Sequence, residues 1–254
     1  MLNYMSDRML KPFERFAYYY DDFMRRVVDY RGWVNYVQKI FDRYQIKVTR
    51  ILDLACGSGI PSIILAEMGY EVIGLDSSQE MLSVFVSKIK NRNLKITIKY
   101  ADMRDFTLDR QVDACVSFYD SMNYLLTEDD LRKCFSCVAQ SLRAGGLFAF
   151  DMNTVFCLEH FWNNKETPRI TQELYTIWKN TYDPATRISK LYLTVKTKTG
   201  EEFSELHQER GYYPTEISEA LGAAGFTRID FYNHGTFEPI NEVTLRMMIV
   251  AQKP

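Results

Sequence analysis

Apolar and polar positions along residues 50–151 switch repeatedly between two spacings. Short apolar runs of strand length begin near Ile51, Val72 and Val112. The segments after the first two runs, and the segment 127–142, repeat apolar residues every three or four positions, as amphipathic helices do. A regular order of strand and helix favours parallel strands joined by helical crossovers. The pattern therefore predicts an α/β domain built on a mostly parallel sheet.

Residues 170–212 follow a different pattern. Leu191, Leu193 and Val195 alternate with polar or amphipathic positions, a period of two that is typical of half-buried strands. Turns at 183–184 and 199–200 separate three such runs and predict an antiparallel insertion of roughly three strands. A helix from Pro214 and two strands, at about 226–232 and 243–251, then return to the α/β pattern.

The segment before the first strand is rich in aromatic residues. Trp33, Tyr36, Ile40 and Phe41 recur at helical spacing, so one helix face is expected to pack on the sheet domain. Three consecutive tyrosines at 18–20 cannot all point inward, because neighbouring residues face different sides of any regular element. We therefore expect a helical lid in which one tyrosine faces something other than the core.

A glycine turn follows the first strand, and an acid precedes it. A dinucleotide-binding turn has the form G-x-G-x-x-G, but Gly57 and Gly59 are followed by Ser62 at the third position. Burying Asp53 within an apolar strand is costly unless a donor or a cation satisfies it. A ligand with an ammonium or sulfonium group suits this acid better than a pyrophosphate does.

Two further acids stand at the ends of later strands. Asp76 lies 19 residues after Gly57, where an acceptor for ribose hydroxyls is expected in such a fold. Asp102 follows a third strand. Because the carboxyl ends of parallel strands meet at one edge, Asp53, Asp76 and Asp102 are predicted to line one rim.

The stretches D-L-A-C-G-S-G (53–59), G-L-D-S-S (74–78) and A-D-M (101–103) resemble the cofactor motifs of class I S-adenosylmethionine-dependent methyltransferases. The resemblance runs from about residue 14 to the C-terminus and is strongest over 50–151. It implies a Rossmann-like seven-stranded, mostly parallel sheet with helices on both faces, a last strand inserted antiparallel, an antiparallel β insertion and an N-terminal helical lid. The expected parts are a lid at 1–48, a cofactor-binding domain at 49–169 and 213–254, and an insertion at 170–212 that roofs the acceptor pocket or contacts a second subunit.

The resemblance also implies roles for individual residues. Asp53 and the glycine loop would hold the methionine end of S-adenosylmethionine, Asp76 the ribose hydroxyls, and Asp102 would face the adenine amino group. Tyr20 matches a Y-D motif that folds over the cofactor near the reacting methyl group. The expected cofactor-binding residues are Tyr20, Asp53, Ala55, Gly57, Gly59, Asp76, Ser77, Met81, Asp102, Met103 and Phe118.

The loop after the fourth predicted strand is the best candidate for the acceptor side, because polar side chains on a loop held by a rigid sheet commonly carry function. Asp120 in this loop could instead cap the following helix, but Thr127 already fits that role. An oxygen or carbon acceptor needs a general base. The catalytic candidates are Tyr20, Asp120 and His207, and Glu209 is a further candidate base.

Composition narrows the class of protein. The chain has 254 residues and a formal net charge of −2, without the basic face that a nucleic-acid substrate requires. No apolar run approaches the roughly 18 residues that span a bilayer, and the first eight residues lack the apolar core of a secretion signal. We therefore expect a cytoplasmic protein, a monomer or homodimer, with no membrane contact.

Cysteine and histidine usage predicts neither a disulfide scaffold nor a metal site. Five cysteines are an odd number. Cys134 and Cys137 have C-x-x-C spacing, but they lie in a predicted helix with no second pair, and the three histidines are far apart in sequence.

The function that the sequence favours is a methyltransferase that transfers a methyl group from S-adenosylmethionine to nitrogen or oxygen of a small molecule. The first alternative is a methyltransferase acting on RNA or protein. Two alternatives from other classes are a nicotinamide-dependent oxidoreductase, which predicts a third glycine where Ser62 stands, and a non-catalytic nucleoside-binding module.

Overall fold

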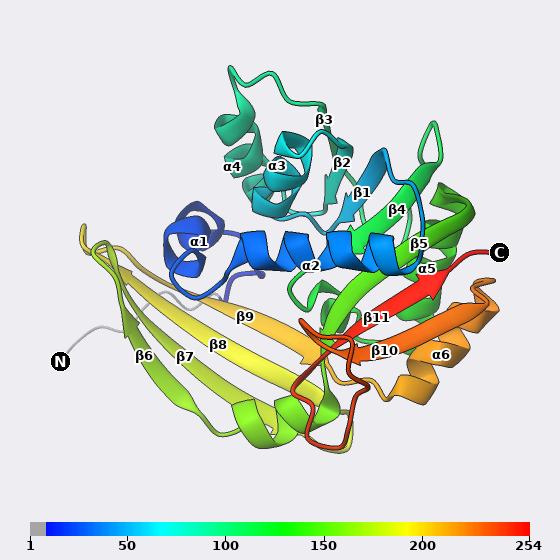
Figure 1. Ribbon diagram of the computed structural model, residues 1–254. Coiled ribbons are helices and arrows are strands. Elements are labelled where there is room, and N and C mark those ends of the chain that lie inside the picture. Colours follow the sequence, from blue (N-terminus) through cyan, green and yellow to red (C-terminus); the bar gives the residue numbers. More distant parts are fainter. Residues whose placement is uncertain (1–8) are drawn as a thin grey trace.

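The computed structural model describes residues 9–254 and contains two sheets. The strands of the larger sheet are β1 (Arg50–Leu54), β2 (Glu71–Asp76), β3 (Ile96–Tyr100), β4 (Val112–Ser117), β5 (Leu142–Asn153), β10 (Arg228–Asn233) and β11 (Arg246–Gln252). Their order is β10-β11-β5-β4-β1-β2-β3, with β1 to β5 parallel and β11 antiparallel between β10 and β5 (Figure 1). The predicted Rossmann-like sheet, including its antiparallel last strand, is confirmed.

Helices cover both faces of this sheet because successive side chains of each strand point to opposite sides. The helices are α1 (Ala17–Met24), α2 (Tyr30–Arg43), α3 (Ile60–Glu67), α4 (Gln79–Ile89), α5 (Glu128–Ser141) and α6 (Pro214–Ala223). Leu52 and Leu54 belong to the core that buries α5 and α6. Ile51 belongs to the core on the other face, which buries α2 and α3.

Helix starts follow the side-chain signals in the sequence. Ser78 accepts a hydrogen bond from the backbone N–H of Met81 at the start of α4, and Thr127 accepts one from Asp130 at the start of α5, both at 3.1 Å. Thr127 was expected in this role from the sequence. Capping by these residues leaves the acids of the neighbouring loops free for other contacts.

The smaller sheet holds four antiparallel strands. They are β6 (Glu166–Ile170), β7 (Leu174–Asp183), β8 (Ile188–Thr197) and β9 (Glu202–Arg210). The sequence predicts only about three strands from residue 170, and β6 is the one it misses. As the edge strand, β6 is almost entirely exposed and contains Pro168, so it lacks the apolar alternation by which buried strands are recognised.

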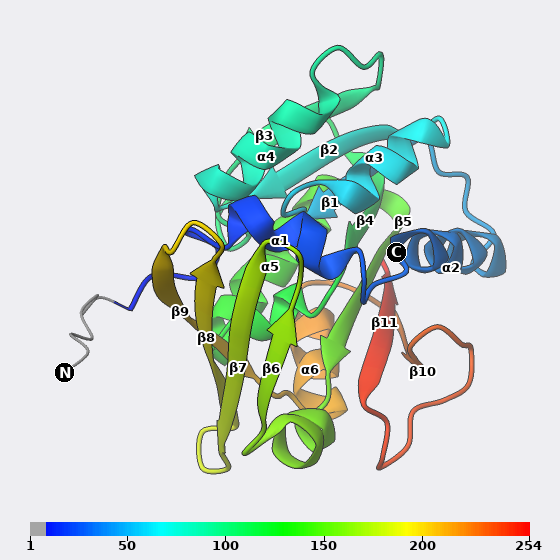
Figure 2. The same ribbon diagram turned by 90° about the vertical axis from the view of Figure 1, so that its left-hand side faces the viewer.

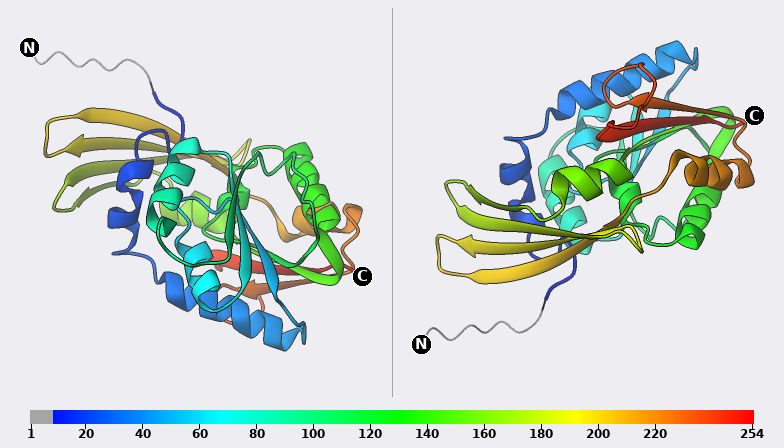
Figure 3. Two further views of the ribbon diagram at one scale, coloured as in Figure 1. Left: turned by 90° about the horizontal axis from the view of Figure 1, so that it is seen from above. Right: turned by 90° about the horizontal axis from the view of Figure 1, so that it is seen from below.

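The smaller sheet projects to one side of the larger one, and α1 lies between the two (Figures 2 and 3). Phe16, Phe23 and Met24 of the α1 segment pack with Leu193 and Phe203 of the smaller sheet. The α1 segment is thus anchored on the small sheet while its other side faces α4. The predicted lid at 1–48 begins with residues 1–8, which lie outside the described part, and the division into lid, cofactor-binding domain and insertion stays a prediction.

Among residues 9–254, no helix is both long enough and apolar enough to span a membrane.

Candidate active site

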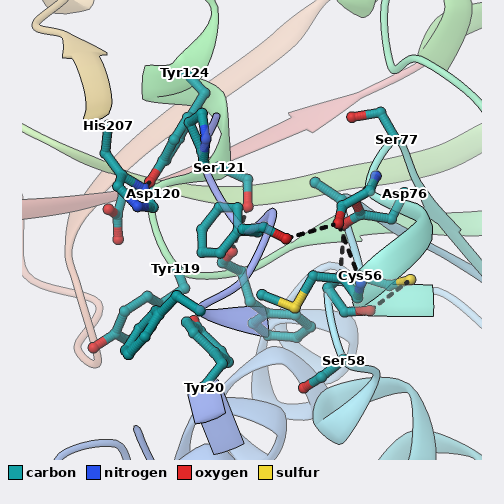
Figure 4. A pocket seen from close by; sticks show the side chains of 18 of the residues that line it. Tyr20, Cys56, Ser58, Asp76, Ser77, Tyr119, Asp120, Ser121, Tyr124 and His207 are labelled. Carbon is teal, nitrogen blue, oxygen red and sulfur yellow. Dashed lines mark hydrogen bonds between the residues drawn. The ribbon is translucent and has the colours of Figure 1, made fainter. Parts of the chain in front are cut away.

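The carboxyl ends of β1, β2 and β4 open on a cavity of about 770 Å³, within the range usual for small-molecule sites. Side chains at its two ends differ in kind (Figure 4). We call the part formed by 55–58 and 76–81 the glycine end. The opposite part, formed by Tyr119, Asp120, Tyr124, His207 and Glu209, is called the aromatic end. The α1 segment and the small sheet, through Tyr20 and Leu191, also line the cavity.

Asp76 ends β2 and lines the glycine end, as predicted from its spacing. Its carboxylate accepts backbone N–H groups of Gly57 and Ser78, both at 2.8 Å. Burial raises the pKa of Asp76, while these N–H donors oppose the rise. The carboxylate is therefore held in one orientation by the loop, with lone pairs left for a ligand in the cavity.

Asp53 is buried at the centre of the sheet and also lines the cavity. The hydroxyl of Ser62 donates to it at 2.5 Å. Burial raises the pKa of Asp53 to about 7, and the Ser62 bond opposes that rise. Ser62 was seen in the sequence only as a missing third glycine, yet the structure shows that its hydroxyl satisfies the acid nine residues earlier.

The two glycines of the turn serve different purposes. Gly57, at φ +53°, lines the cavity, and a Cβ built on it would meet nothing nearer than Met81 Cε at 4.0 Å. Gly59, at φ +79°, is not among the residues lining the cavity, and a Cβ there would lie 2.2 Å from the ring of Phe85. Gly57 thus exposes backbone to the cavity, whereas Gly59 allows α4 to pack against the turn.

The remaining residues predicted to bind the cofactor separate into two groups. The structure brings five of them to the cavity, namely Ala55, Ser77, Met81, Met103 and Phe118. Asp102 is not among the lining residues; Arg104 donates to its carboxylate from Nε at 2.9 Å and Nη2 at 2.6 Å, and this bond holds the pKa of Asp102 below its ordinary value. Contact between Asp102 and an adenine stays a prediction.

A sharp bend of the backbone places Asp120 at the aromatic end. Tyr119 and Asp120 both have left-handed φ values, +65° and +55°, which cost energy for residues other than glycine. The carboxylate of Asp151 holds the bend by accepting the N–H groups of both residues, at 2.6 and 2.9 Å. Asp120 precedes a short 3-10 helix at Ser121–Tyr124 and makes no side-chain cap to it, and α5 is capped by Thr127, so the carboxyl group of Asp120 is directed elsewhere.

Asp120 belongs to a buried group of charges drawn from four elements. Arg246 Nη1 donates to Asp120 Oδ1 at 2.7 Å and also to Asp151. The side chains of Asp120 and Glu209 are hydrogen-bonded to each other, and Asn153 donates to Glu209 at 2.9 Å. Burial raises the pKa of both carboxyl groups; Arg246 opposes the rise for Asp120, and the neighbouring Asp120 adds to it for Glu209. One proton held between two carboxyl groups explains this arrangement.

His207 also faces the aromatic end, but both of its ring nitrogens are engaged. Nε2 lies 3.1 Å from a carboxylate oxygen of Glu205, and Nδ1 lies 2.9 Å from the hydroxyl of Tyr124. Because a carboxylate only accepts, Nε2 donates to Glu205 and Nδ1 accepts from the Tyr124 hydroxyl in the neutral ring. In this tautomer neither ring nitrogen of His207 is without a hydrogen-bond partner.

The α1 segment closes over the cavity through two anchor points. Glu205, which is fully buried, accepts backbone N–H groups of Phe13, Arg15 and Phe16, each at 2.8 Å. On the other side, Asp21 accepts from the hydroxyl of Ser58 and from Lys88 Nζ. The α1 segment is thus fastened to the small sheet, to the glycine turn and to α4.

Tyr20 lies on the inner side of the lid and lines the cavity, as predicted. Its ring stands edge-on to the rings of Phe13 and Phe16, with centroids 5.7 and 6.1 Å apart. Burial raises the pKa of its hydroxyl well above the ordinary value. Tyr20 therefore stays a neutral phenol and is suited to contact rather than to accepting a proton.

Several residues of this site carried no signal in the sequence. Glu205, Arg246 and Lys88 each make their contact across a long sequence separation: 189 to 192 residues for Glu205, 95 and 126 for Arg246 and 67 for Lys88. In the sequence each reads as an ordinary charged residue.

Comparisons with known proteins give a consistent result. The family model described as "Methyltransferase domain" matches residues 51–146. A protein of Geobacillus sp. (strain WCH70) that carries a methyltransferase name is 30% identical over 247 residues, which cover 95% of this chain and 99% of the relative. A crystal structure of an S-adenosylmethionine-dependent methyltransferase from Clostridium acetobutylicum ATCC 824 superposes with a TM-score of 0.85 at 27% identity, over 95% of this chain and 98% of that one.

A shorter similarity joins part of the chain to an enzyme with a named acceptor. It reaches 30% identity over 125 residues, or 49% of this chain and 51% of the dTDP-3-amino-3,4,6-trideoxy-alpha-D-glucopyranose N,N-dimethyltransferase of Streptomyces venezuelae.

Proposed function

The chain belongs to the class I S-adenosylmethionine-dependent methyltransferases, and we propose that it methylates nitrogen or oxygen of a small molecule held at the aromatic end. S-adenosylmethionine is its cofactor. The observation that carries the proposal is a single cavity with two unlike ends, closed over by a lid and a small sheet. One end fits a nucleoside, and the other leaves room for an acceptor.

The glycine end fits the cofactor on three counts. Gly57 leaves open space where a side chain would stand, so a ligand can lie against its backbone. Asp76 presents an oriented carboxylate to ribose hydroxyls, which hydrogen bonds from Gly57 and Ser78 hold in place. Asp53 is a buried acid with one hydroxyl donor, and a cationic group of the methionine part would supply the charge that it lacks.

When bound, S-adenosylmethionine supplies a methyl group on a positively charged sulfur, and the acceptor's lone pair forms the new bond to carbon while the carbon–sulfur electron pair passes to sulfur. The protein must then hold the acceptor in line and keep water out. Tyr20 and Tyr119 both line the cavity, Tyr119 at its aromatic end. The electron-rich faces of such rings attract a sulfonium, which suits these tyrosines to the place where the methyl group passes.

A small acceptor is favoured over RNA or protein. The aromatic end is bounded by Phe13 and Tyr20 of the α1 segment and by His207 and Glu209 of β9, a lining on the scale of a small molecule. The chain also has a net charge of −2, against the basic surface that RNA requires. The Streptomyces relative is named for methylating a sugar nucleotide, which supports a small-molecule acceptor here.

A nicotinamide-dependent oxidoreductase is a different family from the one to which this chain belongs. Ser62 stands where that family requires a third glycine, and its hydroxyl is committed to Asp53.

Label transfer tests the proposal. The purified protein is incubated with S-adenosylmethionine carrying a labelled methyl group, and with one of three acceptor pools: small amines and alcohols, transfer RNA, or denatured bacterial protein. We expect label in the small-molecule pool, and at least tenfold less with Asp76→Ala, which removes the ribose acceptor, than with the surface control Asp109→Ala. Label in RNA or protein alone, or none above a heat-inactivated sample, would refute the proposal.

A further inference from the structure

The charge of the cavity wall restricts the acceptor. Among the described residues that line the cavity, the six carboxyl groups are those of Glu14, Asp53, Asp76, Glu80, Asp120 and Glu209. Lys11 supplies the one ammonium group in that set, and no guanidinium belongs to it. A cavity with this balance attracts cations and repels anions.

The two acids nearest the acceptor's place are Asp120 and Glu209. Both are more than nine-tenths buried, with 5% and 6% of their surface exposed, and both line the cavity. Their mutual hydrogen bond requires a proton on one of them. Arg246, the cation nearest to Asp120, is shared with Asp151. The pair thus shares one proton and keeps one carboxylate, and both side chains line the cavity.

Aromatic rings line the same cavity as this pair. Tyr20, Tyr119, Tyr124 and Trp178 belong to the same cavity wall. Ring faces attract ammonium groups more strongly than neutral hydroxyl groups, so they add to the preference for a cation. This second feature is independent of the carboxyl groups and points to the same chemistry.

A basic amine suits the pair better than an alcohol does. An alkylammonium loses its proton near pH 10, the ordinary range of a lysine, and a buried carboxylate with a raised pKa is well matched to receive that proton. An aliphatic hydroxyl group is a far weaker acid, and no base of sufficient strength lines the cavity among the described residues: His207 has both ring nitrogens engaged.

We propose that Asp120 and Glu209 together bind the acceptor and take its proton, and that the acceptor is a small molecule with a basic amine and no phosphate group. The inference rests on the proposed function and deepens it. The absence of a phosphate distinguishes this acceptor from a sugar nucleotide, whose diphosphate would enter a wall of acids with Lys11 as its one cation among the described lining residues.

The protons and electrons of the step balance as follows. A carboxylate oxygen of the pair takes one proton from the ammonium group, which frees the nitrogen lone pair. That lone pair forms the bond to the methyl carbon as the carbon–sulfur bond breaks, and its electrons go to sulfur. The product leaves as an N-methylammonium ion, and the proton on the carboxyl pair passes to solvent.

Matched pairs of probes test the inference without turnover. The protein is saturated with S-adenosylhomocysteine, the demethylated product of the cofactor, and titrated in a calorimeter at pH 7.5. The three pairs are 2-phenylethylamine with 2-phenylethanol, cyclohexylamine with cyclohexanol, and butylamine with butanol. A fourth comparison, of ethanolamine with O-phosphoethanolamine, examines the phosphate.

Two near-isosteric variants, Asp120→Asn and Glu209→Gln, are compared with the surface variant Asp109→Asn. Asparagine tolerates the left-handed backbone at position 120, and glutamine can still accept from Asn153. Nucleoside affinity within twofold of the parent shows that each variant is folded, and the glycine end is intact.

We expect at least one amine to bind tenfold or more tighter than its alcohol, both site variants to lose that preference, and Asp109→Asn to keep it. Phosphorylation of ethanolamine should weaken binding. The inference is overturned if no amine outperforms its alcohol, if either site variant keeps the preference, or if the phosphorylated probe binds more tightly. Binding of the nucleoside without amine preference refutes this inference alone, whereas failure of the nucleoside to bind refutes the proposed function as well.

Discussion

The carboxyl group of Asp53 couples folding to ligand binding. Its pKa in the folded protein is about 7, against 3.8 ordinarily, because it is buried. Between about pH 4 and pH 7 the unfolded chain therefore loses this proton while the folded chain keeps it. This group lowers the stability of the ligand-free protein progressively as the pH rises through that window, and the cost is complete above pH 7.

Replacing Asp53 by Asn should remove that cost. We expect Asp53→Asn to be more stable than the parent at pH 8, by an amount on the order of 1–4 kcal/mol, and equally stable near pH 4. Nucleoside affinity should fall, because the cationic part of the cofactor loses its partner. Denaturant unfolding at the two pH values measures the first effect. An Asn variant less stable than the parent at pH 8 would show that the ionised carboxyl group stabilises the ligand-free fold.

Adding a methyl group to each of the two glycines of the turn should have different effects on stability and on ligand binding. Gly59→Ala should lose about 2–4 kcal/mol of stability, since its Cβ would collide with Phe85 at a left-handed residue. Gly57→Ala faces open space and should lose only about 1–2 kcal/mol, but the added methyl group intrudes on the ligand. Unfolding and nucleoside titration are measured on both variants. Equal stability losses, or unchanged affinity in Gly57→Ala, would count against this division of roles.

The sequence predicted the position of individual residues well where that position depends on their spacing from the glycine turn. Asp76 and Gly57 stand where the turn and the next strand place them. Spacing does not reveal which way a position faces. Gly59 and Asp102 were therefore predicted to bind the cofactor, although neither lines the cavity. The carboxylate of Asp102 is instead paired with Arg104, two residues later.

At the level of elements, the α1 segment is fixed at two points. Glu205 fastens residues 13–16 to β9 by accepting three backbone N–H groups. Burial raises the pKa of this carboxyl group, but hydrogen bonds from His207 and from the backbone outweigh that effect and hold the pKa below its ordinary value. Asp21 ties α1 to the glycine turn through Ser58 and to α4 through Lys88. The second fastening stands at the glycine end, because Ser58 itself lines the cavity.

Weakening that fastening should speed nucleoside release. We expect Asp21→Asn to raise the dissociation rate of S-adenosylhomocysteine about five- to tenfold, since it removes a charge-assisted bond of about 1–3 kcal/mol. Stopped-flow displacement measures the rate. The neighbouring exposed residue supplies the control, Asp22→Asn, which should leave the rate unchanged. An unchanged rate in Asp21→Asn would mean that the lid does not govern release.

Helices and strands could be predicted from the sequence where one face of the element, or the whole element, is buried. The predicted helix at 127–142 corresponds to α5 at Glu128–Ser141, and the strand at 71–76 matches β2. The edge strand β6 was missed because little of it is buried. The sequence shows alternation only where one face of a strand meets a core.

At the scale of the whole molecule, the site depends on the order of strands in the sheet. β11 enters antiparallel beside β5, which places Arg246 opposite Asn153 and within reach of Asp120 and Asp151. These acids lie 126 and 95 residues away in sequence. No local sequence pattern indicates such a contact, because it arises from the order of the strands in the sheet. The Rossmann-like arrangement could be predicted from the motifs, whereas this charge cluster could not.

We propose above all that Asp76 and the glycine turn bind the nucleoside of S-adenosylmethionine. Calorimetric titration of the parent protein, of Asp76→Asn and of the surface variant Asp109→Asn is the most direct test. We predict micromolar binding of S-adenosylmethionine and S-adenosylhomocysteine, about −8 kcal/mol, a loss of about 1–3 kcal/mol in Asp76→Asn alone, and no binding of NAD. Unchanged affinity in Asp76→Asn, or binding of NAD in place of the two sulfur nucleosides, would contradict it.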